Sequence, residues 1–110
     1  MSQAAPDLDT TLAALADPDR RRTIDVLREG PRRAGELARA VGLPAPAMSR
    51  HLRVLRQSGL VEESHPEFDA RVRIYSLRTR PIAELRAWLD ETEVLWTEQL
   101  AAFKRHVEGN

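Results

Sequence analysis

The most informative stretch of the chain is GLPAPAMSRHLRVLRQSGLV, residues 42–61. On a helix from about residue 46 to 57, Met48, Leu52 and Leu55 fall on one side and form a buried face. Polar side chains occupy the rest of the helix surface: Ser49, Arg50, Arg53, Arg56 and Gln57. An exposed helix face with arginine, serine and glutamine can enter the major groove of DNA, where arginine pairs with guanine edges or with phosphates.

A shorter helix is expected just before this one, over residues 34–41. Leu37, Ala38 and Val41 share its inner face, and Gly42 ends it. Two short helices joined by a tight turn that contains glycine form a helix-turn-helix unit.

The pattern changes from helical to alternating after Gly59. A short strand is expected at residues 60–62 and a longer one at 71–77, around a polar loop. A two-stranded hairpin directly after a helix-turn-helix is a wing, which we place at residues 62–77. Alternation puts three side chains on one strand face: Arg71, Arg73 and Tyr75. The two arginines are candidates for minor-groove or phosphate contacts; alternatively, they serve only to discourage edge pairing.

Two further helices are expected upstream. The leucines of residues 8–15 predict a short amphipathic helix that stops at Asp17-Pro18. Asp17 suits the N-cap of the next helix and Pro18 its first position. That helix ends at Gly30-Pro31, and three side chains give it an apolar face: Ile24, Val26 and Leu27. Residues 1–7 are expected to form a flexible lead, which leaves residues 8–110 as one domain.

The last segment predicts a long helix over about residues 81–107, with Pro81 at its first position. Such a helix would be roughly 39 Å long. Its apolar residues recur every three or four positions, and one small domain cannot easily cover that stripe. We therefore expect a second copy of the chain to cover it.

The charges are unevenly distributed although 17 Lys and Arg balance 17 Asp and Glu. Residues 1–19 hold four acids and no base, whereas residues 20–80 hold fourteen arginines against seven acids. Residues 81–110 hold three bases and six acids. Overall neutrality therefore does not exclude nucleic acid as a partner, because the basic surplus falls on the helix-turn-helix and wing.

Several function classes are disfavoured by what the sequence lacks. There is no cysteine, so disulfides, thiolate metal sites and cysteine nucleophiles are excluded. No apolar run approaches the roughly 18 residues of a membrane span, and residues 1–9 do not read as a signal peptide, so a cytoplasmic location is expected. No nucleophile–base pairing, phosphate loop or metal motif is recognised, and we do not expect an enzyme.

Two positions keep open interpretations. His51 lies at the boundary of the buried face, where a packing or phosphate role is expected rather than metal binding. The run Arg20-Arg21-Arg22 does not complement the dipole of the helix it opens. One of these arginines is expected to pair with Asp17, Asp19 or Asp25, another to reach the DNA backbone, and the sequence does not say which.

Four segments together resemble the ArsR/SmtB family of bacterial winged-helix repressors. They are LADPDRRRTI at 15–24, ELA at 36–38, MSRHLRVLRQSGLV at 48–61 and RIYSL at 73–77. The resemblance covers about residues 8–107. It implies a mainly α fold with a minor β part (α+β): a winged helix-turn-helix of about five helices, a two-stranded hairpin wing and a long C-terminal dimerisation helix.

The resemblance also implies a function, that of an autoregulatory homodimeric repressor. Its helices 46–57 would enter successive major grooves of an imperfect palindrome in double-stranded DNA, and its wings would touch the flanking minor grooves. The expected DNA contacts are Ser49, Arg50, His51, Arg53, Gln57, Arg71 and Arg73. The expected dimer contacts on the first and last helices are Leu8, Leu12, Leu89, Trp96, Leu100 and Phe103. Pro44-Ala45 stand where many relatives carry Ser-Gln, so the operator should differ.

The family's metal sites do not match this chain. The site on the third helix needs cysteines, and residues 36–41 have none. The site on the last helix needs an aspartate and histidines across the dimer, but this helix offers Asp90, Glu91, Glu93 and Glu98 with a single histidine, His106. We therefore expect no metal and no cofactor, and interpret the acids as a solvated face. A small organic effector stays open, as does an alternative function, a winged-helix module that binds protein without specific DNA binding.

Overall fold

A computed structural model describes residues 8–109 of the chain. Within these residues, five helices and three short strands follow one another in the order α1 (Leu8–Leu15), α2 (Pro18–Leu27), β1 (Arg32–Arg33), α3 (Ala34–Val41), α4 (Ala45–Gln57), β2 (Val61–Ser64), β3 (Ile74–Leu77) and α5 (Arg80–Glu108). The mainly α, winged helix-turn-helix architecture expected from the sequence is confirmed. The expected flexible lead, residues 1–7, lies outside the described residues.

The N-terminus of α2 follows the predicted capping pattern. The Asp17 carboxylate accepts hydrogen bonds from the backbone N–H groups of Asp19 and Arg20, at 2.8 and 3.2 Å, and Pro18 occupies the first helical turn. Burial raises the pKa of Asp17, but these backbone hydrogen bonds outweigh it, and the net pKa lies below its ordinary value.

The core joins α1–α4 to the base of the hairpin. Leu37, Met48, Leu52, Leu55 and Leu60 are its largest fully buried apolar side chains. The predicted inner faces of α3 and α4 are therefore confirmed. Gly42, with φ +80°, supplies the left-handed residue that ends α3 and turns the chain into α4.

The hairpin differs from the prediction in three ways. The strand β2 covers Val61–Ser64 rather than residues 60–62. The strand β3 begins at Ile74 rather than at residue 71, and a third strand, β1, pairs with it so that the sheet order is β1-β3-β2. Tyr75, expected to share a strand face with Arg71 and Arg73, is only 5% exposed because it packs in the hydrophobic core. The alternation of residues 71–77 was misleading because residues 71–73 lie outside the ladder.

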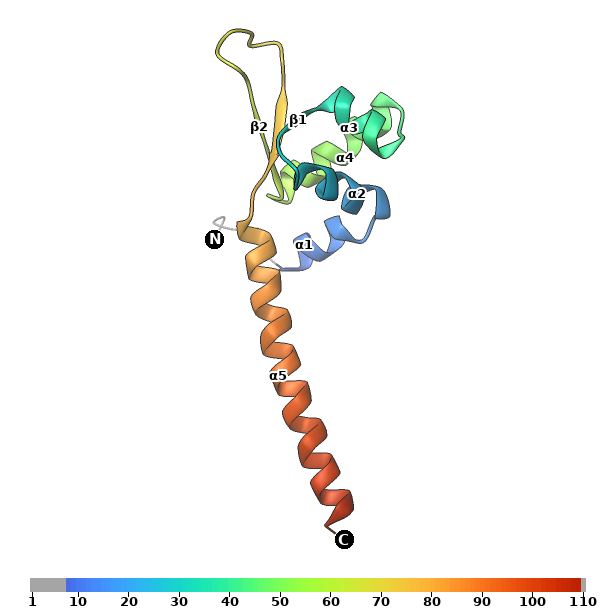
Figure 1. Cartoon of the computed structure of the whole chain (residues 1–110), viewed down its shortest axis with the longest axis vertical. Helices are drawn as coiled ribbons and strands as arrows, with labels where there is room; N and C mark the ends of the chain where they lie inside the picture. Colours follow the sequence, from blue (N-terminus) through green and yellow to red (C-terminus); the bar gives the residue numbers. More distant parts are fainter. Residues whose placement is uncertain (1–7, 110) are drawn as a thin grey trace.

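The long helix α5 leaves the body and runs away from it as a single rod, while the hairpin projects from the opposite end (Figure 1). Its 29 residues span about 43 Å. Only its first turns contact the body, where α1 packs against it. Within residues 8–109 a membrane span is absent, since even this longest helix is interrupted by charged side chains.

Candidate nucleic-acid interface

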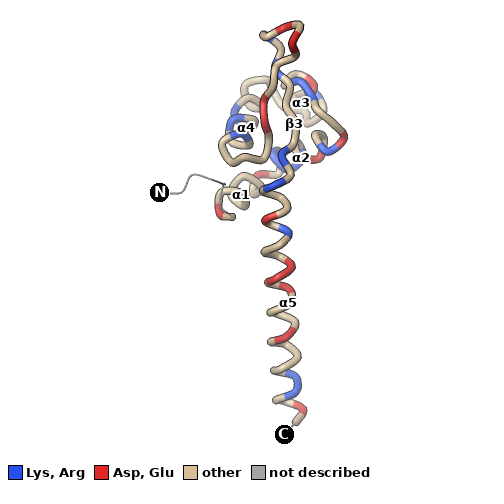
Figure 2. Tube along the Cα trace, turned by 90° about the vertical axis from the view of Figure 1, so that its left-hand side faces the viewer, with Lys and Arg blue, Asp and Glu red and all other residues tan. Residues whose placement is uncertain are grey.

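Helix α4 presents one polar face to solvent. Met48, Leu52 and Leu55 hold its other side in the core. Five exposed side chains therefore form the outer face of α4: Ser49, Arg50, Arg53, Arg56 and Gln57. Blue segments mark its arginines in Figure 2. An open hollow of about 400 Å³ lies on this face, lined by Arg53, Arg56 and Gln57.

The outer face keeps most of its positive charge. Within residues 8–109, Arg50 and Arg53 form no ion pair, whereas Arg56 Nη1 lies 3.5 Å from Glu63 Oε2. The beginning of α4 is also open, because its N-cap is Pro44, which offers no side-chain acceptor. Unpaired guanidinium groups and free backbone N–H groups are the donors that DNA phosphates and base edges accept.

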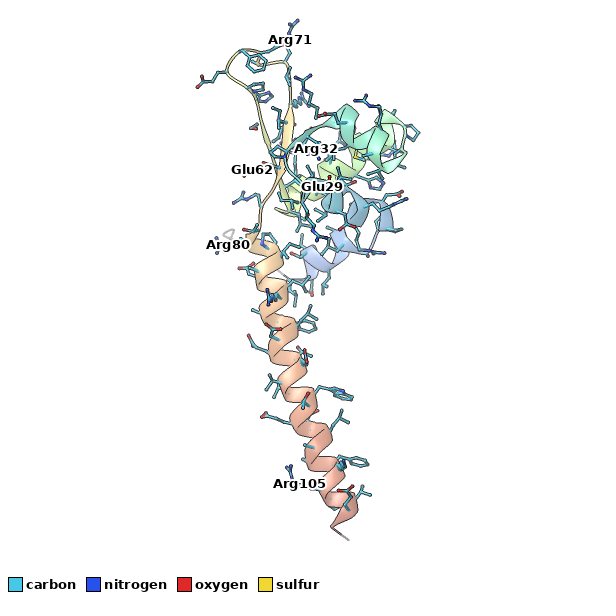
Figure 3. All side chains as sticks on the ribbon, in the orientation of Figure 1. Glu29, Arg32, Glu62, Arg71, Arg80 and Arg105 are labelled. Carbon is cyan, nitrogen blue, oxygen red and sulfur yellow. The ribbon has the colours of Figure 1, made fainter. Side chains whose placement is uncertain are left out.

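The wing carries less positive charge than its arginines suggested. Residues 61–77 hold two arginines and four acids, whereas residues 20–60 hold ten arginines and three acids. The basic surplus therefore lies in residues 20–60, on α2 and β1 as well as on the helix-turn-helix, and not on the wing. Figure 3 shows Arg71 at the tip of the hairpin, far from the base of the wing.

Both wing arginines pair with acids of the wing. Arg71 Nε lies 3.2 Å from Asp69 Oδ1, although its side chain is 92% exposed. Hydrogen bonds from the backbone and side chain of Arg71 hold the pKa of Asp69 below its ordinary value. Arg73 Nη1 lies 3.8 Å from Glu63 Oε2. These pairs are exposed on at least one side and weak, so the arginines can exchange a carboxylate for a phosphate.

His51 faces α2 rather than the outer face of α4. Its Nδ1 lies 3.3 Å from Nη1 of Arg20, and its Nε2 lies 3.9 Å from Oδ2 of Asp19. The His51 side chain is only 17% exposed. The packing role considered for this residue fits that position, and its expected DNA contact stays a prediction.

The three consecutive arginines of α2 have separate partners. Arg20 reaches back to the end of α1 and across to His51. Arg21 Nη1 donates a 2.7 Å hydrogen bond to the Leu15 carbonyl, and Arg22 pairs with Asp19. The expected pairing with an aspartate is therefore confirmed for Arg22, with Asp19, and for Arg20, with Asp17.

Three potential metal donors converge beside His51. Single ligand atoms of Asp17, Asp19 and His51 lie within 4.8 Å of one another. Sequence reasoning treated Asp17 only as a cap and did not group these residues. The guanidinium group of Arg20 pairs with Asp17 and that of Arg22 pairs with Asp19. The arginines therefore supply the positive charge that a metal ion would otherwise provide. The arrangement is better suited to fixing α2 against α4 than to holding an ion.

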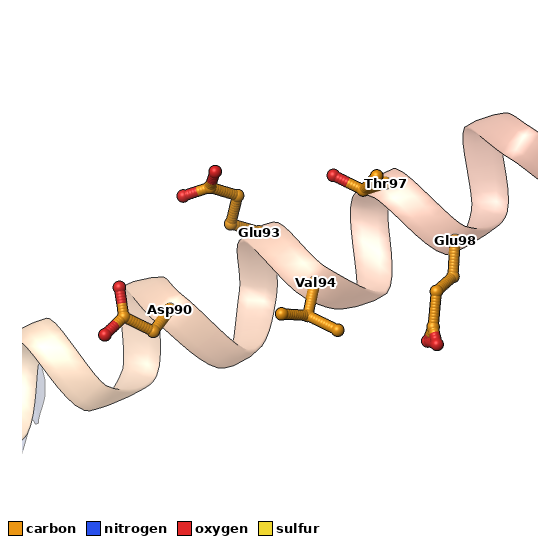
Figure 4. A pocket seen from close by; sticks show the side chains of 5 residues that line it. All are labelled: Asp90, Glu93, Val94, Thr97 and Glu98. Atoms are coloured by element: carbon orange, nitrogen blue, oxygen red, sulfur yellow. The ribbon is translucent and has the colours of Figure 1, made fainter.

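The surface of α5 is apolar on one side and acidic on another. Leu89, Trp96, Leu100 and Phe103 are about half exposed or more, as is Leu12 of α1, while Leu8 is partly buried. An open hollow of about 430 Å³ lies on this one helix, lined by Asp90, Glu93, Val94, Thr97 and Glu98 (Figure 4). Its carboxylates agree with the predicted solvated face and would repel DNA.

Two functional groups were missed from the sequence. Arg56 belongs to the outer face of α4, and Glu63 gathers Arg56, Arg73 and Tyr75 at the base of the wing. Helical spacing placed Arg56 on the polar surface beside Ser49, but Arg56 was left out of the expected DNA contacts. A helix-turn-helix followed by a wing, with unpaired arginines on its second helix, defines a winged helix-turn-helix DNA-binding protein.

Known proteins confirm this class. Over 90 residues the chain is 42% identical to the HTH-type transcriptional regulator NmtR of Mycobacterium tuberculosis, covering 82% of this chain and 70% of that protein. Residues 17–63 match the family model described as bacterial regulatory protein, arsR family. The chain therefore belongs to the arsR family and is a DNA-binding transcriptional regulator.

Solved structures agree with this assignment. The crystal structure of an ArsR family transcriptional regulator matches with a TM-score of 0.73 at 32% identity, covering 88% of this chain and 97% of that one. The transcriptional repressor BigR from Xylella fastidiosa matches with a TM-score of 0.59 at 30% identity, covering 72% and 79%. These likenesses support a regulator, and not the alternative of a protein-interaction module.

Proposed function

We propose that this regulator is a homodimeric, autoregulatory repressor that binds an imperfect palindrome upstream of its own gene. The outer face of α4 reads the major groove through Ser49, Arg50, Arg53 and Gln57. The wing arginines, Arg71 and Arg73, contact the flanking backbone or minor groove. The proposal rests on one observation. Arg50 and Arg53 lie at the centre of the exposed face of α4, and within residues 8–109 neither of them forms an ion pair.

Dimerisation is the second part of the proposal. Two observations support dimerisation: α5 carries an exposed apolar stripe, and α1 packs against the same helix. A second copy would bury Leu89, Trp96, Leu100 and Phe103 together with Leu8 and Leu12 of α1. A twofold axis between the copies would then place two α4 helices on two half-sites. Because such a repressor acts on the chromosome, we place it in the cytoplasm.

Fluorescence anisotropy on DNA from upstream of the gene tests the proposal. Wild-type protein should bind a palindrome there with nanomolar affinity and bind a scrambled duplex far more weakly. Affinity should fall steeply with salt, because arginine–phosphate contacts release counterions. Equal affinity for both duplexes, or binding that ignores salt, would contradict the proposal.

A further inference from the structure

The side chain of Arg20 joins three helices. Its Nε donates a 2.7 Å hydrogen bond to the Ala14 carbonyl of α1, and its Nη2 donates to the Ala13 carbonyl at 3.3 Å. Its Nη1 lies 3.3 Å from Nδ1 of His51 in α4. The side chain is only 17% exposed. Arg20 is therefore used inside the protein and is poorly placed to bind phosphate.

The contact between Arg20 and His51 has a defined direction. A guanidinium group only donates hydrogen bonds, so in its contact with Arg20 the Nδ1 of His51 can only accept; the other ring nitrogen is Nε2. That Nε2 faces Asp19, at 3.9 Å from Oδ2. Both ring nitrogens thus point to residues of α2. The histidine ties α4 to α2 at the level of Ser49 and Arg50, the predicted base-reading residues.

The other end of Arg20 reaches the part of the protein that contacts α5. The carbonyls of Ala13 and Ala14 belong to the last turn of α1, where helical partners run out, although the Ala13 carbonyl also accepts a 3.3 Å hydrogen bond from the Ala16 N–H. Arg20 supplies further partners, and α1 packs on α5. A shift of α1 along α5 would pull the guanidinium group away from either the carbonyls or His51.

We propose that Arg20 is a positioning residue for DNA binding, which holds the recognition helix α4 in register with the α1–α5 unit without touching DNA. The inference rests on the proposed function of the outer face of α4. It adds a physical connection between the helices expected to form the dimer and the helix expected to read the operator.

Arg20→Met tests the proposal, with Arg21→Met as its matched control. Both variants remove one positive charge and hydrogen bonds to carbonyls of α1, two from Arg20 and one from Arg21. Only Arg20 also reaches His51 and Asp17. Operator affinity should fall roughly 3- to 30-fold in Arg20→Met and stay near wild type in Arg21→Met. Equal losses in the two variants would overturn the proposal, because end-capping of α1 would then explain both.

The salt dependence separates positioning from direct contact. Because Arg20 releases no counterion, the slope of log affinity against log salt should be unchanged in Arg20→Met. In Arg71→Met, which removes a wing arginine proposed to contact the flanking DNA backbone, the slope should fall by about 1. A similar drop in Arg20→Met would show that Arg20 binds phosphate, and would overturn the proposal.

Variants of His51 keep the test decisive if Arg20→Met does not fold. His51→Leu removes the acceptor and leaves the α1 carbonyls capped, whereas His51→Asn keeps an acceptor near the position of Nδ1. Affinity should be lower in His51→Leu than in His51→Asn, again with an unchanged slope. Where both single variants fold, the loss in Arg20→Met/His51→Leu should be smaller than the product of the single losses. Independent losses, or normal binding by His51→Leu, would overturn the proposal.

The same titrations distinguish this inference from the proposed function. If wild-type protein does not prefer the operator over scrambled DNA, the proposed function itself fails and the inference with it. If wild-type protein prefers the operator and Arg20→Met does so equally well, only the inference fails.

Discussion

The Tyr75 hydroxyl donates a 2.8 Å hydrogen bond to Oε2 of Glu63 across the paired strands β3 and β2. The same carboxylate lies within 4 Å of guanidinium nitrogens of Arg56 and Arg73. Burial raises the pKa of the Tyr75 hydroxyl, and its hydrogen bond to Glu63 raises that pKa further. Glu63 thus fastens the wing to α4 and neutralises part of the charge that would face DNA.

Glu63→Gln should strengthen binding to DNA of any sequence and steepen its salt dependence. Without the carboxylate, Arg56 and Arg73 become free to pair with phosphates, which should raise the salt slope by about 1 to 2. Anisotropy with a random duplex at several salt concentrations measures this. Glu62→Gln is the matched control, since Glu62 is exposed and forms no ion pair within residues 8–109. If the two variants change alike, pairing by Glu63 does not restrain the arginines.

Arg50→Ala should weaken operator binding by about 1–3 kcal/mol and relax the choice of base at one position of each half-site. Arg50 is exposed and unpaired within the described part of the chain, so the thermal midpoint should not move. A panel of operators with single base changes, titrated by anisotropy, reads both effects. Arg105→Gln, which removes an exposed arginine far along α5, is the control. Normal specificity in Arg50→Ala would show that the reading face is assigned wrongly.

Trp96→Asp should convert the protein into a monomer, because it places a carboxylate in the apolar stripe of α5. Trp96 is 60% exposed in the single chain. Val94→Asp is the control, since Val94 is equally exposed but lies about 160° around the helix. Sedimentation velocity measures both variants. A dimer that survives Trp96→Asp, or is lost equally in Val94→Asp, would contradict the proposed interface.

Asp17→Ala should lower the free energy of unfolding by about 1 kcal/mol, since it removes the N-cap of α2. The pKa of Asp17 is depressed in the folded chain. The stabilisation by its charge is therefore present above the ordinary carboxyl pKa of 3.8 and is lost as the pH falls through the lower folded-state pKa.

Asp17→Asn provides the control for the pH dependence, because it keeps a capping oxygen that does not titrate. Urea unfolding of the wild type and of this variant should differ most at neutral pH. The difference should shrink below about pH 4 as the carboxylate is protonated. A difference that does not change with pH would mean that the charge of Asp17 contributes no stability.

Local patterns predicted most of the fold. The bounds of α3 and the N-cap at Asp17 depend only on residues that are close in the sequence, and both were predicted. The strand β1 was not, because Arg32 and Arg33 have no apolar alternation and pair only through their backbone with β3. Tyr75 likewise packs in the core, although the period of two placed it on one strand face with Arg71 and Arg73.

The candidate site was predictable only in part, because local spacing places side chains on a face but does not identify their partners in the folded chain. The outer face of α4 follows from helical spacing alone. The partners of its residues do not, since Arg20 and His51 are 31 positions apart and meet through the packing of α2 on α4. The ion pair that neutralises Arg73 was likewise not predictable, because its partner Glu63 comes from the other side of the hairpin.

The most direct test of the central claim is cleavage of operator DNA from a tethered reagent. The chain has no cysteine, so Ala45→Cys at the exposed start of α4 offers one attachment point for an iron chelate. A complex docked through α4 should cut the DNA in both half-sites, about one helical turn apart. The same chelate on Val94→Cys of α5 should leave the operator intact. Cuts from Val94→Cys, or none from Ala45→Cys in a complex that still binds, would contradict the assignment of α4 as the reading helix.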